Sequence, residues 1–218
     1  MRSSEPADGI ASGGRLRRLQ RVLRSLDCDG LRGIALALVC AALLAATLGG
    51  EALRGALRYD RNALAAGQWW RLVTAHLVHL SFEHAAVDVL ALVLLWMLFG
   101  RDYSPRAWLL VLAGAAAAID LGLWLADSTL IWYVGSSGVL HGVFAAGVVA
   151  HLKRGERDGW LLGALLVAKL TFEQSVGALP LVPGPVVVDA HLFGALGGTL
   201  AALTCRVQPG PLWRGEPV

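Results

Sequence analysis

Long apolar runs alternate with short polar connections along most of the chain. A bilayer core about 30 Å thick requires roughly 20 apolar residues in each helix that crosses it, and several runs reach or approach that length. Some of them are rich in Ala and Gly, which suits close helix packing better than lone exposure to lipid. The pattern predicts an all-α polytopic membrane protein with six transmembrane helices, at about 33–50, 84–100, 107–126, 137–152, 159–177 and 187–205.

Composition supports this class of protein and excludes others. Hydrophobic residues make up 56% of the 218 residues and charged residues 16%, whereas soluble domains have about 45–50% and about 25%. The chain is therefore too apolar for an ordinary soluble or disordered protein, and its three cysteines are too few for a secreted disulfide scaffold. The length allows one domain. We expect a basic N-terminal segment over 1–32, a six-helix domain over 33–205 and a short tail over 206–218.

The Lys and Arg residues orient the predicted helices, because these side chains resist translocation. If all six runs cross, most basic residues fall on one side, namely Arg2, Arg15, Arg17, Arg18, Arg21, Arg24, Arg32, Arg101, Arg106, Lys153, Arg154, Arg157, Arg206 and Arg214. The other side receives Arg54, Arg58, Arg61 and Arg71, all in the connection 51–83. Both termini are therefore expected in the cytoplasm, with the N-terminal segment contacting anionic lipid and no nucleic-acid partner.

Two outer connections have distinct compositions. The amphipathic connection 51–83 contains Trp69, Trp70 and Arg71 in succession, a combination typical of the headgroup zone of a membrane. The stretch 177–186 holds three prolines and two glycines, which exclude a regular helix. We expect it to form an outer loop lying over the bundle.

Ionisable residues inside the predicted spans are costly and therefore mark a site by default. They are His84, Asp88, Asp120, His141, Lys169, Glu173 and His191. In the predicted topology, three spans bring polar groups to one level near the outer face. Lys169 and Glu173 are four residues apart and are expected to form a structural ion pair that Asp120 can join. His141 lies one turn below Ser137 and is expected to bond to the second or sixth span.

Ser137 and His191 form the natural catalytic pair among these residues. A serine hydroxyl becomes a nucleophile when a base takes its proton, and histidine is the usual base. Ser137 begins the fourth span between Gly135 and Gly138, where free backbone N–H groups can stabilise an anion. Two glycine pairs spaced four apart are expected to bring spans four and six into backbone contact, namely Gly138 with Gly142 and Gly194 with Gly198.

Three segments together resemble the rhomboid intramembrane serine proteases. They are the run from Trp70 to Asp88, the tetrapeptide Gly135-Ser136-Ser137-Gly138, and the run from Ala190 to Gly198. Their order, their spacing and the six-span layout all match that family over about residues 33–205. The stretches 59–71 and 134–142 look most like the rhombosortase branch.

The resemblance implies a six-helix bundle with a water-filled cavity open to the outside. It implies Ser137 as nucleophile and His191 as base, in a dyad that has no acid and needs no cofactor or metal. His84 matches a family histidine that helps to hold the oxyanion. The family has Asn where this chain has Asp88, so Asp88 either is protonated by its apolar surroundings or orients His84.

The rhombosortase resemblance further implies the substrates and the location. The substrates would be proteins with a C-terminal anchor, made of a Gly-Gly-containing tail, a transmembrane helix and a basic end. Cleavage would take place in the bacterial inner membrane, with the active site facing the periplasm. The acyl-enzyme would pass to water or to an amine, and the sequence leaves both outcomes open.

Other functions compete with proteolysis. A rhomboid-like protein could bind membrane proteins without cutting them, although such proteins are expected to lack the serine or the histidine, and both are present here. A membrane metal-binding protein could use His76, His79, His84 and Asp88, since imidazole and carboxylate are zinc ligands. A channel or transporter is disfavoured, because the polar residues gather at one level and line no path.

Overall fold

The computed structural model of the protein describes residues 22, 28, 30–178 and 184–209. Most of the predicted basic segment 1–32, part of the tail 206–218 and the middle of the proline-rich stretch 177–186 lie outside these residues. The described chain is mostly helical, as predicted.

Each predicted apolar run forms one long helix with nearly the expected bounds. These helices are α2 (Gly30–Ala46), α6 (Phe82–Phe99), α7 (Pro105–Ala126), α8 (Ser137–Lys153), α9 (Asp158–Val176) and α10 (Val188–Thr204). Polar caps fix two of the starts: the Ser81 hydroxyl accepts from the His84 N–H, and the Ser104 hydroxyl accepts from the Ala107 N–H. Such caps satisfy N–H groups that a helix start would otherwise leave without a partner.

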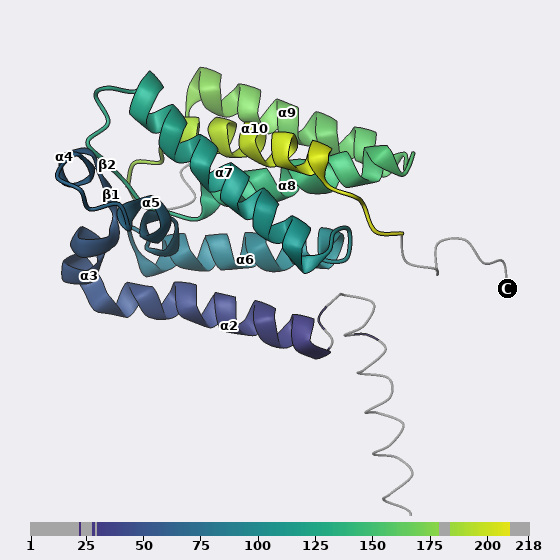
Figure 1. Ribbon diagram of the computed structural model, residues 1–218, viewed down its shortest axis with the longest axis horizontal. Coiled ribbons are helices and arrows are strands. Elements are labelled where there is room, and N and C mark those ends of the chain that lie inside the picture. Colours follow the sequence, from purple (N-terminus) through teal and green to yellow (C-terminus); the bar gives the residue numbers. More distant parts are fainter. Residues whose placement is uncertain (1–21, 23–27, 29, 179–183, 210–218) are drawn as a thin grey trace, which may run out of the picture.

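Within the part of the chain that the structure describes, three helical segments are long and apolar enough to cross a membrane. They are Gly30–Leu57, Phe82–Phe99 and Pro105–Ala126. The helices α8 and α10 have only 17 residues each, and α9 carries Lys169 and Glu173 in its second half. Of these three helices, α8 and α10 pack against each other and against α7, while α9 packs mainly against α8 (Figure 1).

The helix α10 lies at the centre of the bundle, against α7 and α8 (Figure 1). The predicted glycines make the contact with α8. A Cβ atom on Gly194 would lie 2.0 Å from the Gly138 carbonyl oxygen, and one on Gly198 would lie 2.3 Å from that of Gly142. Because these distances leave no room for any side chain, the two backbones touch directly.

Short elements gather at the end of the bundle where α6, α8 and α10 begin (Figure 1). They are η1 (Thr47–Gly49), α3 (Gly50–Leu57), β1 (Tyr59–Asp60), α4 (Arg61–Ala65), α5 (Arg71–Thr74), η2 (Ala75–Leu77) and β2 (Trp132–Tyr133). The strands β1 and β2 pair antiparallel, with Tyr59 opposite Tyr133. The all-α prediction did not include this pair, which links the connection 51–83 to the residues before Ser137.

The arginines of the connection 51–83 bond within the protein. Arg61 donates to the carbonyl oxygens of Leu123, Trp124, Asp127 and Leu130, and so closes the C-terminal end of α7. Arg71 is buried and donates to the carbonyls of Gly55 and Arg58. The prediction that Arg71 faces lipid headgroups is therefore wrong, whereas Trp69 and Trp70 are exposed. Arg71 turns inward because these carbonyls need donors.

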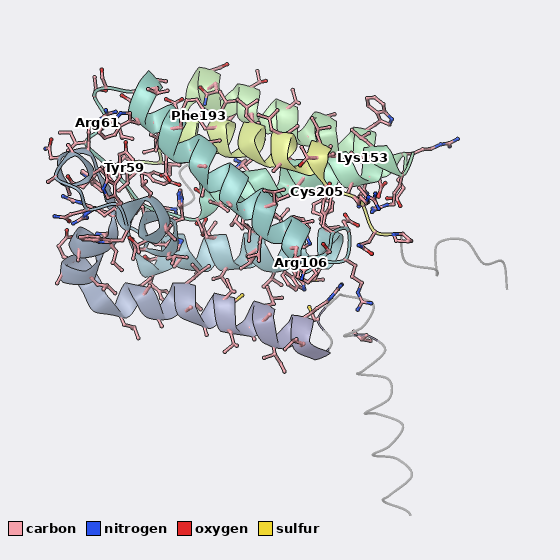
Figure 2. All side chains as sticks on the ribbon, in the orientation of Figure 1. Tyr59, Arg61, Arg106, Lys153, Phe193 and Cys205 are labelled. Atoms are coloured by element: carbon pink, nitrogen blue, oxygen red, sulfur yellow. The ribbon has the colours of Figure 1, made fainter. Side chains whose placement is uncertain are left out.

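A charged network lies at the opposite end of the bundle, where Figure 2 places Arg106 and Lys153 far from Tyr59 and Arg61. Arg154 contacts Asp102 at 2.9 Å and Glu156 at 2.9 Å. The buried His151 imidazole lies 3.3 Å from the same Asp102. This network joins the connection between α6 and α7 to the connection between α8 and α9.

Candidate active site

The side chains of Ser137 and His191 meet near the starts of α8 and α10. The Ser137 Oγ atom lies 2.9 Å from the His191 Nε2 atom. His191 is buried and Ser137 is partly buried. The glycine contacts between α8 and α10 bring this pair together, because they hold the two helix starts at the closest backbone approach. The hydroxyl is thus placed to give its proton to the imidazole.

A carboxylate lies behind this histidine. The Glu173 Oε2 atom, from α9, is 2.9 Å from the His191 Nδ1 atom, and both side chains are buried. The expected ion pair between Lys169 and Glu173 is present through the other carboxylate oxygen. The expectation of a pair without an acid is therefore not what the structure shows. Sequence spacing paired Glu173 with Lys169 but did not identify the contact of its second carboxylate oxygen with His191.

His141 flanks the same histidine. Its ring stacks on the His191 ring, with centroids 4.1 Å apart and planes 14° from parallel. Its Nδ1 atom lies 2.7 Å from the Ser137 carbonyl oxygen, one turn earlier on α8. Of the two spans that His141 was expected to bond to, it contacts the sixth, α10, and the contact is ring stacking.

Gly135 lies against His84 and Ser137, whose side chains both line open space beside it. Its φ of 123° is a conformation that side chains rarely adopt. A Cβ atom there would lie 3.4 Å from the His84 Nε2 atom and 3.9 Å from the Ser137 Oγ atom. A small polar group that enters this space can therefore contact the imidazole of His84 and the hydroxyl of Ser137 at once.

Asp88 holds Ser136. Its Oδ2 atom accepts from the Ser136 N–H at 3.1 Å and from the Ser136 hydroxyl at 2.8 Å, and lies 3.1 Å from the His79 Nε2 atom. His84 is more distant, with its Nε2 atom 4.0 Å from the same oxygen. This set of donors suits an ionised carboxylate. Asp88 therefore contacts Ser136 and His79 more closely than His84, the residue that it was expected to orient.

The remaining ionisable residues separate from this group. The His76 Nε2 atom lies 3.5 Å from the Asp120 Oδ1 atom, so Asp120 does not join Lys169 and Glu173. His79 connects the segment 51–83 to α6 through its contact with Asp88. His76 instead faces Asp120 on α7, and its ring makes a T-shaped contact with the Tyr133 ring of β2.

Two cavities meet at His84 and Ser137. One, of about 380 Å³, extends below the outer connections past Trp132 and Tyr133. The other, of about 210 Å³, runs between α6 and α9 and reaches His191. Asp127 lies at the edge of the first cavity, where a hydrogen bond from the Thr129 side chain lowers the pKa of its carboxyl. The serine is thus accessible from two directions.

The alternative metal set is only partly assembled: the Nε2 atoms of His79 and His84 lie 3.1 Å and 4.0 Å from the Asp88 Oδ2 atom, whereas His76 has another partner. Since His76 faces Asp120, the four residues His76, His79, His84 and Asp88 do not converge on one point. Donor atoms of His141, Glu173 and His191 do lie within 4.8 Å of one another. Their hydrogen bonds and ring stacking already account for that closeness.

Comparison with known proteins assigns the family. Residues 66–208 match the family model described as Rhomboid domain. This chain belongs to the rhomboid family. A Bacillus subtilis (strain 168) protein called "Putative rhomboid protease YdcA" is 28% identical to it over 142 residues, which cover 65% of this chain and 70% of that protein.

Family membership and the apolar helices make this rhomboid an integral membrane protein. The match covers α6 to α10 and therefore includes every side chain that surrounds Ser137. The helices α2 and α3 lie before the matched residues.

Proposed function

We propose that this rhomboid is an intramembrane serine endopeptidase with Ser137 as nucleophile and His191 as base. The observation that carries the proposal is the 2.9 Å contact between Ser137 Oγ and His191 Nε2 at the start of a helix beside two cavities. Family membership supports the same chemistry.

The proposed reaction has two stages. As the Ser137 Oγ atom bonds to the peptide carbonyl carbon, its proton passes to His191 Nε2. The carbon–nitrogen bond then breaks, and the same proton leaves with the new amine. Water next attacks the acyl-enzyme, giving one proton to His191, which returns it to Ser137 Oγ as the acid is released. An amine could replace water in this second stage.

The negative oxygen of the intermediate needs donors. We assign this role to the Ser137 backbone N–H and the His84 side chain, which border the space beside Gly135. The Ser136 N–H is excluded, since it already donates to Asp88. Asp88 thus serves the site indirectly, by holding the turn that leads into α8.

We further propose that all six long helices cross the membrane, with both termini in the cytoplasm and the serine facing the periplasm. Arg106 and Lys153 lie at the end of the bundle opposite Tyr59 and Arg61 (Figure 2). The arginines at the other end have internal partners. Lys153 and Arg154 at the opposite end also have internal partners, so the proposed orientation rests on the larger number of basic residues that the predicted topology places at that end.

The proposed substrates are membrane proteins with a C-terminal anchor that contains a Gly-Gly tail, and the proposed location is a bacterial inner membrane. This step rests on the likeness of residues 59–71 and 134–142 to rhombosortases. The cavity between α6 and α9 supports it, because an extended chain can approach Ser137 there from the side.

A fluorophosphonate probe tests the chemistry directly, since it labels an activated serine without any knowledge of the substrate. We expect the purified protein to be labelled, and the Ser137→Ala and His191→Ala variants to lose at least about 10,000-fold in labelling rate. The matched control is Ser136→Ala, which should still be labelled. Labelling of Ser137→Ala at the wild-type rate would overturn the assignment of the nucleophile.

Co-expression with a membrane protein carrying a Gly-Gly anchor tests the substrate class. We expect release of the protein with wild type and none with Ser137→Ala. Capture of the anchor by both forms, without release or labelling, would instead favour a membrane-protein binding factor.

A further inference from the structure

We propose that Glu173 is a positioning residue for His191. The site would then be a triad in which Glu173 holds His191 and His191 acts on Ser137. This inference rests on the proposed function. It adds a carboxylate from α9, a helix that contributes neither the nucleophile nor the base.

The geometry fits this role. The carboxylate and the serine lie at opposite nitrogens of one ring, with Oε2 at 2.9 Å from Nδ1 and Oγ at 2.9 Å from Nε2. A carboxylate accepts and does not donate when ionised, so Nδ1 must carry the hydrogen. The Nε2 lone pair then faces Ser137, as a base requires, and the carboxylate stabilises the imidazolium that forms.

Lys169 supports the carboxylate from the other side. It lies one turn earlier on α9 and pairs with Oε1, which leaves Oε2 for His191. The side chain of Glu173 is 7% exposed and that of Lys169 is 46% exposed. A buried carboxylate needs such partners to stay charged. Lys169 therefore stabilises the negative charge of Glu173, and that charge acts on His191.

His141 restrains the remaining freedom of the ring. It stacks on the face of His191, while Glu173 holds one edge. The charged and titratable groups around His191 are thus His84 and Asp88 on α6, His141 on α8, and Lys169 and Glu173 on α9. Of these carboxylates, only Glu173 bonds to the His191 ring among the described residues.

Glu173→Gln tests the role of the charge. The amide can present its NH₂ group to Nδ1, which would move the ring hydrogen to Nε2 and block the base. We expect kcat to fall by about 100-fold to 10,000-fold with KM nearly unchanged. The labelling rate by fluorophosphonate should fall by a similar factor.

Lys169→Met is the matched control. It removes one partner of the carboxylate but leaves the contact between Glu173 and His191, so we expect kcat to fall at least about tenfold less than in Glu173→Gln. If Glu173 served only to pair with Lys169, the two variants would lose activity equally. An equal loss would therefore overturn the proposal, as would wild-type kinetics in Glu173→Gln.

The double variant Lys169→Met/Glu173→Met covers the case in which Glu173→Gln does not fold. Replacing both members of a buried pair by apolar residues is often neutral for stability. We expect this variant to unfold near the wild-type temperature and to lose at least about 100-fold in labelling. If the double variant were labelled at the wild-type rate, only the proposed role of Glu173 would be overturned. If the wild-type protein itself were not labelled, the proposed function would be overturned.

Discussion

At the scale of single residues, the site depends on an absent side chain as much as on those present. Gly135 adopts a positive φ and borders both His84 and Ser137. Any β-carbon there enters the space that we assign to the oxyanion. Both the positive φ and the space assigned to the oxyanion therefore require glycine at position 135.

We expect Gly135→Ala to lower kcat by at least about 100-fold, the loss typical of a damaged oxyanion site. The new Cβ would lie 3.2 Å from the His84 Cε1 atom, and the positive φ would cost about 1–3 kcal/mol. The measurement is the fluorophosphonate labelling rate. Gly55→Ala is the control, because a Cβ at Gly55 meets nothing within 4 Å, and a similar loss there would contradict the explanation.

At the scale of elements, close packing of α8 against α10 brings the serine to the histidine. The contact has no side chains to adjust, since the carbonyl oxygens of Gly138 and Gly142 meet Gly194 and Gly198. Any added atom must move a helix.

We expect Gly194→Ala to lower the unfolding temperature in detergent by about 5–10 °C, as overpacking costs about 1–3 kcal/mol. Labelling of Ser137 should fall as well, because the two helix starts separate. Leu200→Ala changes a position of α10 that is 66% exposed. It changes the side chain by more atoms than Gly194→Ala does, yet it should lower the unfolding temperature less. The reverse order would show that this contact is not what holds α8 and α10 together.

The sequence predicts these elements well because the physics that sets them is local. Apolar length fixes the long helices, and glycine spacing along α8 and α10 indicates their contact. The partners of single charges are harder to predict. Spacing along α9 reveals Lys169 beside Glu173, yet not that the second carboxylate oxygen reaches another helix. In the same way, nothing local indicates that Asp120 faces His76 or that Arg71 turns inward.

At the scale of the whole molecule, the two ends of the bundle differ. One end holds Ser137, His191 and the two cavities that Ser137 lines. The other holds the network of Asp102, His151, Arg154 and Glu156, which joins two connections. We therefore expect the Asp102 network to contribute to the stability of the fold and the opposite end to carry the proposed reaction.

We expect Arg154→Met to destabilise the fold without slowing the chemistry. It removes a partner from Asp102, whose side chain is 7% exposed, at a cost of about 2 kcal/mol or about 4–8 °C. Labelling per folded molecule should stay within a factor of about three of wild type, given the distance between the two ends. The exposed Arg106→Met serves as the control, and a large change in labelling by Arg154→Met alone would contradict this division.

The pairing of β1 with β2 connects the segment 51–83 to the residues that lead into α8. Because β2 runs almost directly into α8, a molecule that bound the segment around β1 and displaced it would move Ser137 relative to His191 without entering either cavity. Inhibitors of such a protease could therefore be sought among antibodies and peptides as well as among compounds that react with the hydroxyl.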